Sequence, residues 1–457
     1  LVIHTTLSLP DENAADQAVR DHVAQGDQAV GAMAMIQPGT GNVLSLAQSR
    51  PMGRSEPKGE TYLNYSVPTQ YGGSAGFQAG STFKPFVLAA AINKGVPLST
   101  TFNAPQTMTI PQDEFENCPD AGNFAGEWTV SSSTSSGSMD IYRGTRESVN
   151  TFYAMLERVT GVCEPFNIAR KLGVQLTDPT GDSHGYGAER VPTFTLGIAN
   201  ASPLEMAEAY ATFGARGLHC DSHPVTSIDD AQGNEIRAYE NSCQQALPQA
   251  TADAVNDVLR GVQEPGGFGY DLGGTGLSVP SAGKTGTTQD GKSVWFVGYT
   301  PQIATAAMIA GASKDGQRPI PLAGQTIHGT YIYSVTGSGF AGPMWAEAMH
   351  VVDDRLKYED FTAPSATAVQ GVPTTVPSVS GMSVDTAMST LSGAGFKPIQ
   401  GGTVNSTYGA GTVAYTSPSG GSSAPSGSVI TIYESNGIAP APPPSPPGNG
   451  GGHGGGH

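Results

Sequence analysis

A stretch rich in Pro, Thr and Ala, FTAPSATAVQGVPTTVPSV, divides this sequence into parts that we expect to fold separately. Turn-forming residues without regular apolar spacing are typical of a linker. The 457 residues are enough for two or more domains, each with its own core. We therefore predict a large domain over 1–358, a linker over 359–372, a small domain over 373–435 and a disordered Pro/Gly-rich tail over 436–457.

The composition argues against nucleic acid as a partner and favours an exported protein. The net charge is −17 and no basic surface stands out. Only 13% of the residues are charged, while the chain holds 61 Gly and 34 Pro, which suits a loop-rich protein outside the cytosol. The sequence contains no run of about 20 apolar residues and no signal peptide. It begins at Leu1 in LVIHTTLSL as if within a strand, so we expect an N-terminal part to lie outside it.

Four cysteines permit three disulfide pairings, and the sequence alone does not choose among them. Cys220 and Cys243 flank SIDDAQGNEIRAYE, which reads as a hairpin, so this pair is the favoured disulfide. The same two cysteines with His219 and His223 form an alternative, a zinc site. Their spacing matches no common ligand pattern, and we predict no metal site.

The region 1–358 alternates helical and strand-like segments. DENAADQAVRDHVAQ has apolar residues at helical spacing after Asp11, a candidate N-cap, and AVGAMAMIQPGTGNVLSLAQS reads as a strand hairpin. WFVGYT and IATAAMIAG look like successive antiparallel strands. In the small domain, strand-like segments accompany a short helix in VDTAMSTLSGAG. Both helices and strands are therefore expected in each domain.

The pattern Ser-x-x-Lys occurs three times, and only its surroundings separate chemistry from chance. SEPK contains Pro57, so we interpret it as a loop. Ser81 and Lys84 instead begin the apolar helical run STFKPFVLAAAINK, which Gly95 closes. Residues at i and i+3 share a helix face, so Lys84 can reach the Ser81 hydroxyl. Taken alone, the pair is explained more simply by a capping Ser followed by an exposed Lys.

Two further motifs change that interpretation. Ser148-Val149-Asn150 is the only Ser-x-Asn in the chain, and it opens the helical run NTFYAMLERVTG. Lys284-Thr285-Gly286 is the only Lys-Thr-Gly, and strand-like segments follow it. Ser-x-x-K, then a Ser-x-Asn element, then Lys-Thr-Gly is the set of motifs found in penicillin-binding proteins and class A β-lactamases.

The sequence resembles the transpeptidase domain of high-molecular-weight penicillin-binding proteins. The segments that carry the resemblance span most of the first 350 residues: TTLSLPDENAADQAV, GAMAMIQPGTGNVLSL, GFQAGSTFKPFVLAA, RESVNTFYAML, ARKLGV, TLGIANASPLEMAEAYATF and AGKTGTTQDGKSVWFVGYTP. One departure is Ala79, where many relatives carry Pro; another is that no glycosyltransferase domain precedes. Pro373 to Glu434 similarly resembles one PASTA domain, an arrangement similar to actinobacterial members of the bifunctional class. The resemblance implies an α/β (α+β) fold with an antiparallel central sheet flanked by helices, plus a small α+β PASTA domain.

The resemblance implies acyl transfer through an ester on Ser81. The hydroxyl would attack the carbonyl between the last two D-alanines of a peptidoglycan stem peptide, and an amine of a neighbouring stem would then take the acyl group. Lys84 would act as the base, with its pKa lowered by burial and by Lys284 as a second cation. Ser148 would relay the proton to the leaving nitrogen, and Asn150 would hydrogen-bond Lys84 and the substrate amide.

The Lys-Thr-Gly segment is expected to bind the substrate. Because side chains alternate along a strand, Thr285 and Thr287 would share a face and bind the substrate carboxylate, with Gly286 between them. Backbone N–H groups of Ser81 and Thr287 would form the oxyanion hole. The implied chemistry needs no metal or organic cofactor.

The implied partners are stem peptides and, as covalent inhibitors, β-lactams; the PASTA domain would bind cell-wall glycan or muropeptide. The implied location is extracytoplasmic, with an anchor to the cytoplasmic membrane through an N-terminal segment outside this sequence.

Other functions use the same motifs. A β-lactamase of class A carries an E-x-x-x-N element between the second and third motifs, and none occurs between Asn150 and Lys284. A D,D-carboxypeptidase differs only in using water as the acceptor. A wall-binding protein or β-lactam sensor would acylate without turnover. The intact set of motifs favours an active transpeptidase.

Overall fold

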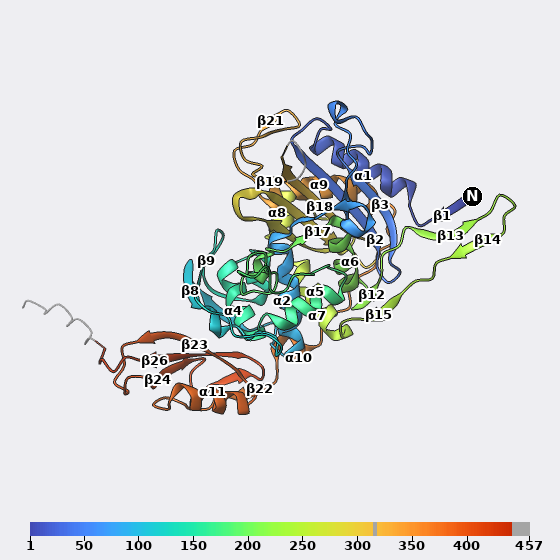
Figure 1. Ribbon diagram of the computed structural model, residues 1–457. Helices are drawn as coiled ribbons and strands as arrows, with labels where there is room; N and C mark the ends of the chain where they lie inside the picture. Colours follow the sequence, from blue (N-terminus) through green and yellow to red (C-terminus); the bar gives the residue numbers. More distant parts are fainter. Residues whose placement is uncertain (314–317, 441–457) are drawn as a thin grey trace, which may run out of the picture. The chain divides into compact units, whose positions relative to one another are not determined.

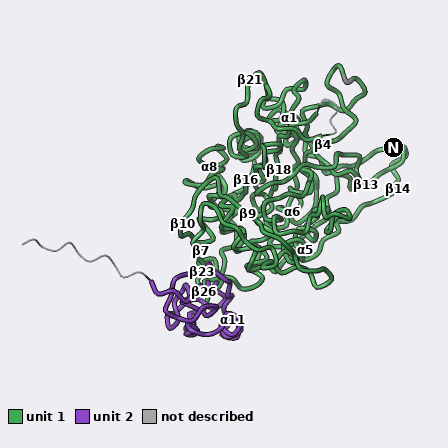
Figure 2. The backbone as a smooth tube through the Cα atoms, turned by 60° about the vertical axis from the view of Figure 1, so that its left-hand side comes forward, with its two compact units in different colours: residues 1–371 green, residues 372–457 purple. Residues whose placement is uncertain are grey.

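The computed structural model describes residues 1–313 and 318–440, and these form two compact units (Figures 1 and 2). The first unit covers 1–371 and the second starts at Val372. Of the tail predicted over 436–457, the part from residue 441 onward lies outside the described residues.

An antiparallel sheet forms the centre of the first unit (Figure 1). Its order is β16 (Ala282–Thr287), β17 (Ser293–Tyr299), β18 (Ala304–Ala312), β2 (Ala29–Gln37) and β3 (Asn42–Gln48), with β19 (Pro319–Ile320) also on β18. The predicted β2–β3 hairpin and the neighbouring β17 and β18 are confirmed. Because β16 pairs only with β17 in this order, the strand that carries Lys284 is an edge strand with one side free of partners from this sheet.

Helices cover both faces of the sheet. Phe296 and Tyr299 of β17 point to opposite faces, because side chains alternate along a strand. Phe296 packs on Trp345 of α9 (Gly342–Asp353), with ring centroids 5.1 Å apart, beside α1 (Leu9–His22). Tyr299 packs on Tyr210 of α6 (Pro203–Gly214), at 5.8 Å. This double cover explains why β18 is buried along its whole length.

A second group of helices surrounds α2 (Lys84–Asn93). The neighbours of α2 are α4 (Asn150–Thr160), α5 (Cys163–Lys171) and α7 (Gln249–Arg260). Every residue from Lys84 to Ala91 is buried, as expected of a helix that is apolar all round. The helix that carries Lys84 is therefore held on all sides.

Helix α1 begins earlier than its capping signal suggested. Its N-cap is Ser8, and Asp11 lies within the first turn. Asp11 forms an ion pair with Arg355 beyond α9 rather than capping the helix. The prediction of Asp11 as a cap is wrong because this partner comes from a distant part of the chain.

Both disulfides lie in the first unit, Cys118–Cys163 and Cys220–Cys243. The second joins β12 (Leu218–Cys220) to β15 (Cys243–Gln245), and β13 (Val225–Asp229) and β14 (Glu235–Ala238) form the hairpin between them. The favoured pairing is confirmed, and with both sulfurs bonded the four-residue zinc alternative is excluded.

The predicted linker contains a short helix, α10 (Ala366–Gln370), within the first unit. The carbonyls of Ala368 and Val369 accept hydrogen bonds from the backbone N–H groups of Leu98 and Ser99, each at 3.0 Å. Residues before Val372 are thus structurally part of the first unit.

The second unit has a sheet of its own. β26 (Val429–Ser435) lies between β23 (Lys397–Val404), which runs parallel to it, and β24 (Val413–Ser417), which runs antiparallel. α11 (Val384–Gly393) is the predicted short helix and buries Leu391 with Phe396, Ile430 and Ile432. A pair of short strands, β22 (Pro373–Thr375) and β25 (Ser423–Pro425), completes it.

The remaining elements of the first unit are mostly short: β1 (Val2–Thr5), β4 (Asn64–Pro68), β5 (Gly73–Ser74), β6 (Phe77–Gln78), β7 (Thr101–Ala104), β8 (Thr107–Pro111), β9 (Glu127–Ser131), β10 (Gly137–Asp140), α3 (Ile141–Arg146), β11 (Asn200–Ala201), α8 (Phe268–Gly273), β20 (Thr326–Ile327) and β21 (Thr330–Tyr331). Within the described part of the chain, none of the helices combines the length and the apolar character that a membrane span requires.

Candidate active site

Ser81 lies on a tight turn that leads into the buried helix α2. The turn is a 3₁₀ helix, η3 (Gly80–Phe83), and α2 begins at Lys84 with Pro85 in its first turn, where no N–H is needed. Ser81 is half-buried, whereas Lys84 is fully buried. The hydroxyl therefore sits at the surface end of a helix whose next turn is inaccessible to solvent.

Glycines let this turn approach strand β16 closely. Gly80 has φ 61°, and a Cβ there would lie 2.9 Å from the Thr287 carbonyl oxygen. A Cβ on Gly286 would lie 2.6 Å from the carbonyl oxygen of Ala79. Only glycine fits at either position without displacing backbone. The first and third motifs are thus in direct backbone contact.

The Lys84 amine is held by the second motif. Its Nζ lies 2.7 Å from the backbone oxygen of Ser148, 3.2 Å from Ser148 Oγ and 2.8 Å from Asn150 Oδ1. The Asn150 amide is oriented in turn, because its Nδ2 donates to the carbonyl of Ser131 at 3.1 Å. The amine also lies 5.3 Å from the centre of the Tyr153 ring.

Ser148 connects the two lysines. Lys284 Nζ lies 2.7 Å from Ser148 Oγ and 3.2 Å from the carbonyl of Thr285. One hydroxyl therefore contacts both amines, and Lys84, Ser148 and Lys284 form a continuous line. Ser148 adopts φ 53°, a left-handed conformation that is uncommon for a residue with a side chain and that occurs more often at functional sites.

Burial changes the proton affinity of both amines. The pKa of Lys84 is lowered well below its usual range, mainly by desolvation and further by the nearby charge of Lys284. Burial also lowers the pKa of Lys284, to about 7. Near neutral pH, the two lysines therefore do not both carry a full charge.

The free edge of β16 faces η3. Thr288 donates its backbone N–H to Ser293 at the start of β17, so the N–H of the preceding Thr287 points away from β17, toward the free edge. Thr287 is exposed and its Oγ1 accepts a hydrogen bond from Gly337 N at 2.9 Å, while Thr285 is buried. The N–H of Thr287 is therefore directed to the free edge of β16.

The structure brings together all the residues that the three motifs single out. One expected contact differs: within the described residues, Lys84 donates to Ser148 and Asn150 rather than to Ser81. Sequence reasoning missed the carbonyl of Ser131, because a backbone oxygen in a Ser-rich loop has no sequence signature. It also missed Tyr153, which the helical periodicity of α4 assigns to the core.

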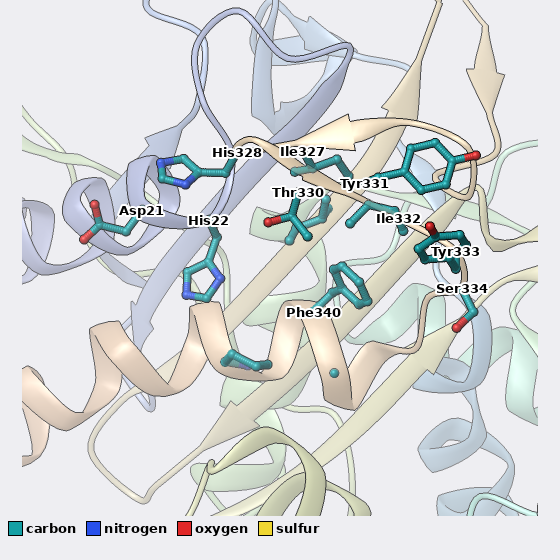
Figure 3. Close-up of a pocket in the computed structure, with 13 residues that line it drawn as sticks. Asp21, His22, Ile327, His328, Thr330, Tyr331, Ile332, Tyr333, Ser334 and Phe340 are labelled. Carbon is teal, nitrogen blue, oxygen red and sulfur yellow. The ribbon is translucent and has the colours of Figure 1, made fainter.

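Figure 3 shows a separate hollow of about 470 Å³ between α1, the β20–β21 hairpin and η7 (Gly337–Ala341). His22, His328, Tyr331 and Phe340 are among its lining residues, and among the described residues the predicted site residues do not line it.

Comparisons with known proteins identify the family. The family model described as penicillin binding protein transpeptidase domain matches residues 31–328, and the PASTA domain model matches residues 374–436. Penicillin-binding protein 1A of Mycobacterium tuberculosis is 28% identical over 389 residues, which are 81% of this chain and 42% of that protein. The Mycolicibacterium smegmatis protein of the same name is 27% identical over 381 residues, 80% of this chain and 43% of that protein. The chain thus spans less than half the length of these curated relatives.

Solved structures show the same fold. PonA1 from Mycobacterium tuberculosis in complex with penicillin V is 25% identical, with a TM-score of 0.61 over 80% of this chain and 89% of that one. A D,D-transpeptidase domain of a peptidoglycan glycosyltransferase from Eggerthella lenta is 21% identical, with a TM-score of 0.55 over 77% of this chain and 82% of that one. The chain belongs to the penicillin-binding protein transpeptidase family, and a PASTA domain follows its transpeptidase domain.

Proposed function

We propose that this chain is a D,D-transpeptidase that crosslinks peptidoglycan stem peptides through an acyl-enzyme on Ser81, and that β-lactams acylate the same serine. The observation that carries the proposal is that Ser148 links two buried lysines, Lys84 and Lys284, beside a half-buried Ser81. A serine hydroxyl is a weak nucleophile and needs an adjacent base. A desolvated lysine can act as this base, so no histidine is needed.

Lys84 is the proposed base. A free lysine has a pKa of about 10.4 and is protonated at pH 7, but burial and Lys284 lower the pKa of Lys84. The Ser148 carbonyl and Asn150 Oδ1 can only accept hydrogen bonds, so a neutral Lys84 donates its two N–H bonds to them. The lone pair of the Lys84 nitrogen is then free to accept a hydroxyl proton. That proton comes from Ser148, or from Ser81 when substrate is bound.

In the proposed reaction, Ser81 Oγ bonds to the carbonyl carbon of the penultimate D-alanine while its proton passes to Lys84. The C–N bond then breaks, and the leaving nitrogen takes a proton through Ser148, which releases D-alanine. The amine of a second stem peptide attacks the ester, gives its proton to Lys84 and returns Ser81 as an alcohol. For a β-lactam, the ring nitrogen stays attached and blocks that second attack.

The proposed oxyanion hole is the pair of N–H groups of Ser81 and Thr287. The free edge of β16 supports it, because Thr287 N–H has no acceptor on β17. Losing one such donor typically costs about 10²–10³ in rate. We assign Thr285, Gly286 and Thr287 to binding of the donor peptide, with Thr287 nearest the substrate carboxylate.

We place the protein outside the cytoplasmic membrane, in the cell wall space, anchored by a segment outside this sequence. Two disulfides support an oxidising compartment. For the second unit, we propose cell-wall glycan or muropeptide as the partner, on the family match alone.

Labelled penicillin tests the nucleophile. We expect one stable adduct per chain on Ser81, identified by mass spectrometry of peptides, and none in Ser81→Ala. Ser55→Ala is the matched control: it changes the Ser-x-x-Lys formed by Ser55 and Lys58, which lies at a short 3₁₀ helix, η1 (Glu56–Lys58), and it should label normally. An adduct that persists in Ser81→Ala contradicts the assignment.

The acceptor of the acyl group distinguishes a transpeptidase from the alternative functions. A stem-peptide thioester is mixed with the chain and a D-amino acid, and the products are weighed. We expect the transfer product; free acid alone indicates a carboxypeptidase, and rapid hydrolysis of penicillin indicates a β-lactamase. An adduct without turnover of the thioester indicates a sensor.

A further inference from the structure

A cluster of metal-ligating side chains lies outside the active site, where helix α6 meets strand β12. Glu208 comes from α6, His219 from β12, and Asp221 follows that strand directly. Their ligand atoms all lie within 4.8 Å of one another. None of the three has a part in the acyl-transfer chemistry proposed above.

The spacing of these atoms matches a shared ion. His219 Nε2 lies 3.5 Å from Glu208 Oε1 and 3.4 Å from Asp221 Oδ1. Two ligand atoms about 2.0–2.1 Å from a tetrahedral Zn²⁺ are about 3.4 Å apart. Both distances are long for a hydrogen bond and right for two ligands of one metal.

A hydrogen-bond chain points the free nitrogen of His219 at the carboxylates. Thr212 Oγ1 has one proton, and it donates this proton to the backbone oxygen of Glu208 at 3.2 Å. Thr212 Oγ1 also lies 3.1 Å from His219 Nδ1, and because its own proton is on the Glu208 oxygen it accepts from Nδ1–H. In a neutral imidazole, Nε2 then carries a lone pair, and His219 is only 3% exposed. When both carboxylates are ionised, this buried lone pair faces only acceptors, and a cation among the three groups gives each of them a partner.

The ligands are held in place by their surroundings. Glu208 accepts a backbone N–H from Ser222 at 3.0 Å. The Cys220–Cys243 disulfide fixes the strand between His219 and Asp221, and Asp221 N donates to the backbone of Ser242 at 2.9 Å. A hollow of about 240 Å³ is lined by Glu208, Asp221 and Tyr71, and gives an ion access and room for a water ligand.

We propose that Glu208, His219 and Asp221 bind a divalent transition-metal ion, with Zn²⁺ as the best match to one nitrogen and two oxygen ligands. The ion joins the middle of α6 to β12 and has a structural role. Thr212 is a positioning residue, because it fixes the tautomer of His219 without touching the metal.

Zinc titration of the metal-free full chain tests the proposal, with a chromophoric chelator as competitor and Co²⁺ absorption as a report on geometry. We expect one saturable site per chain, a tetrahedral Co²⁺ spectrum and a higher melting temperature with zinc. His219→Gln and Glu208→Gln should abolish all three effects. Thr212→Val keeps every ligand and should weaken zinc binding by about 10–100-fold.

His223→Gln is the matched control, since it removes a neighbouring histidine that is not a ligand, and it should bind zinc normally. Every variant keeps His453 and His457, so weak binding in the tail is common to all of them. Penicillin labelling of each variant checks that it folds. Equal zinc binding in wild type and His219→Gln, or no saturable site in the wild type, overturns the proposal; saturation by Ca²⁺ or Mg²⁺ but not Zn²⁺ overturns the choice of ion.

Discussion

Ser148 is the residue on which both lysines depend. Its hydroxyl lies within 3.2 Å of Lys84 Nζ and 2.7 Å of Lys284 Nζ, and its backbone oxygen holds Lys84 as well. A left-handed residue other than glycine costs about 1 kcal/mol or more. The chain accepts this cost because the conformation presents the hydroxyl and the carbonyl of one residue to the same amine.

At this scale, the pH dependence of acylation follows from Lys284. Only unprotonated Lys84 accepts a proton, so the rate of acylation by penicillin should fall as the pH drops and Lys84 becomes protonated. The charge of Lys284 lowers the pKa of Lys84. Lys284→Gln removes that charge, raises the pKa of Lys84 and should move the acidic limb of the rate profile to higher pH.

The measurement is the second-order rate constant for a fluorescent penicillin across pH. Lys284→Arg keeps the charge, so its limb should stay close to that of the wild type even if its maximal rate is lower. A limb at the same pH in Lys284→Gln and the wild type would show that the two amines are not coupled.

At the scale of elements, the site depends on how closely η3 approaches β16. A Cβ on Gly80 would lie 2.9 Å from Thr287 O and 3.0 Å from its N. Gly80→Ala should therefore push the turn from the strand and slow penicillin acylation by about 100-fold, since a shift of about 1 Å is enough for such a loss.

The Gly95→Ala variant separates the effect of this steric clash on acylation from the effect of backbone strain. Gly95 also has a left-handed φ, of 79°, but a Cβ there would meet nothing within 4 Å. Both variants should lose a similar amount of stability from the backbone, about 1 kcal/mol, and Gly95→Ala should acylate normally. Equal acylation rates in the two variants would contradict the role given to the η3–β16 contact.

Local patterns in the sequence predicted those elements that are determined by interactions between residues close together in the chain. The β2–β3 hairpin and the turn between β13 and β14 follow from their Gly-containing turns between strand-like runs. The predicted start of α1 was wrong because Asp11 pairs with Arg355, more than 300 residues away. The left-handed Ser148 and the Ser131 carbonyl depend on tertiary packing, which no local pattern records. The motifs predicted which residues meet, and the resemblance implied the hydrogen bond between Lys84 and Asn150, whereas the bond from Asn150 to the Ser131 carbonyl came only from the structure.

At the scale of the whole molecule, the boundary between the units is a testable feature. Phe361 packs on Tyr299 with ring centroids 5.6 Å apart, and α10 bonds to the backbone after α2. A chain of residues 1–371 keeps these contacts and should acylate with penicillin at the full-length rate. A chain of residues 1–358 loses them.

Burying a phenylalanine side chain contributes about 1.5–3 kcal/mol, so the 1–358 chain should melt several degrees below the 1–371 chain. Differential scanning calorimetry of the two chains measures this. Equal melting temperatures would support the domain boundary predicted from the sequence, at residue 358, over the structural one.

The hydrogen bond from Asn150 to the Ser131 carbonyl has a consequence for inhibitor design. Strand β9 ends at Ser131, and that carbonyl decides which end of the amide Lys84 meets. A drug that displaces the end of β9 frees the Asn150 amide to rotate. Its NH₂ group then donates a hydrogen bond to the Lys84 amine and occupies the lone pair that would accept the Ser81 proton, so the drug slows its own attachment. Compounds that leave this loop undisturbed should therefore react faster than bulkier ones of equal ring strain.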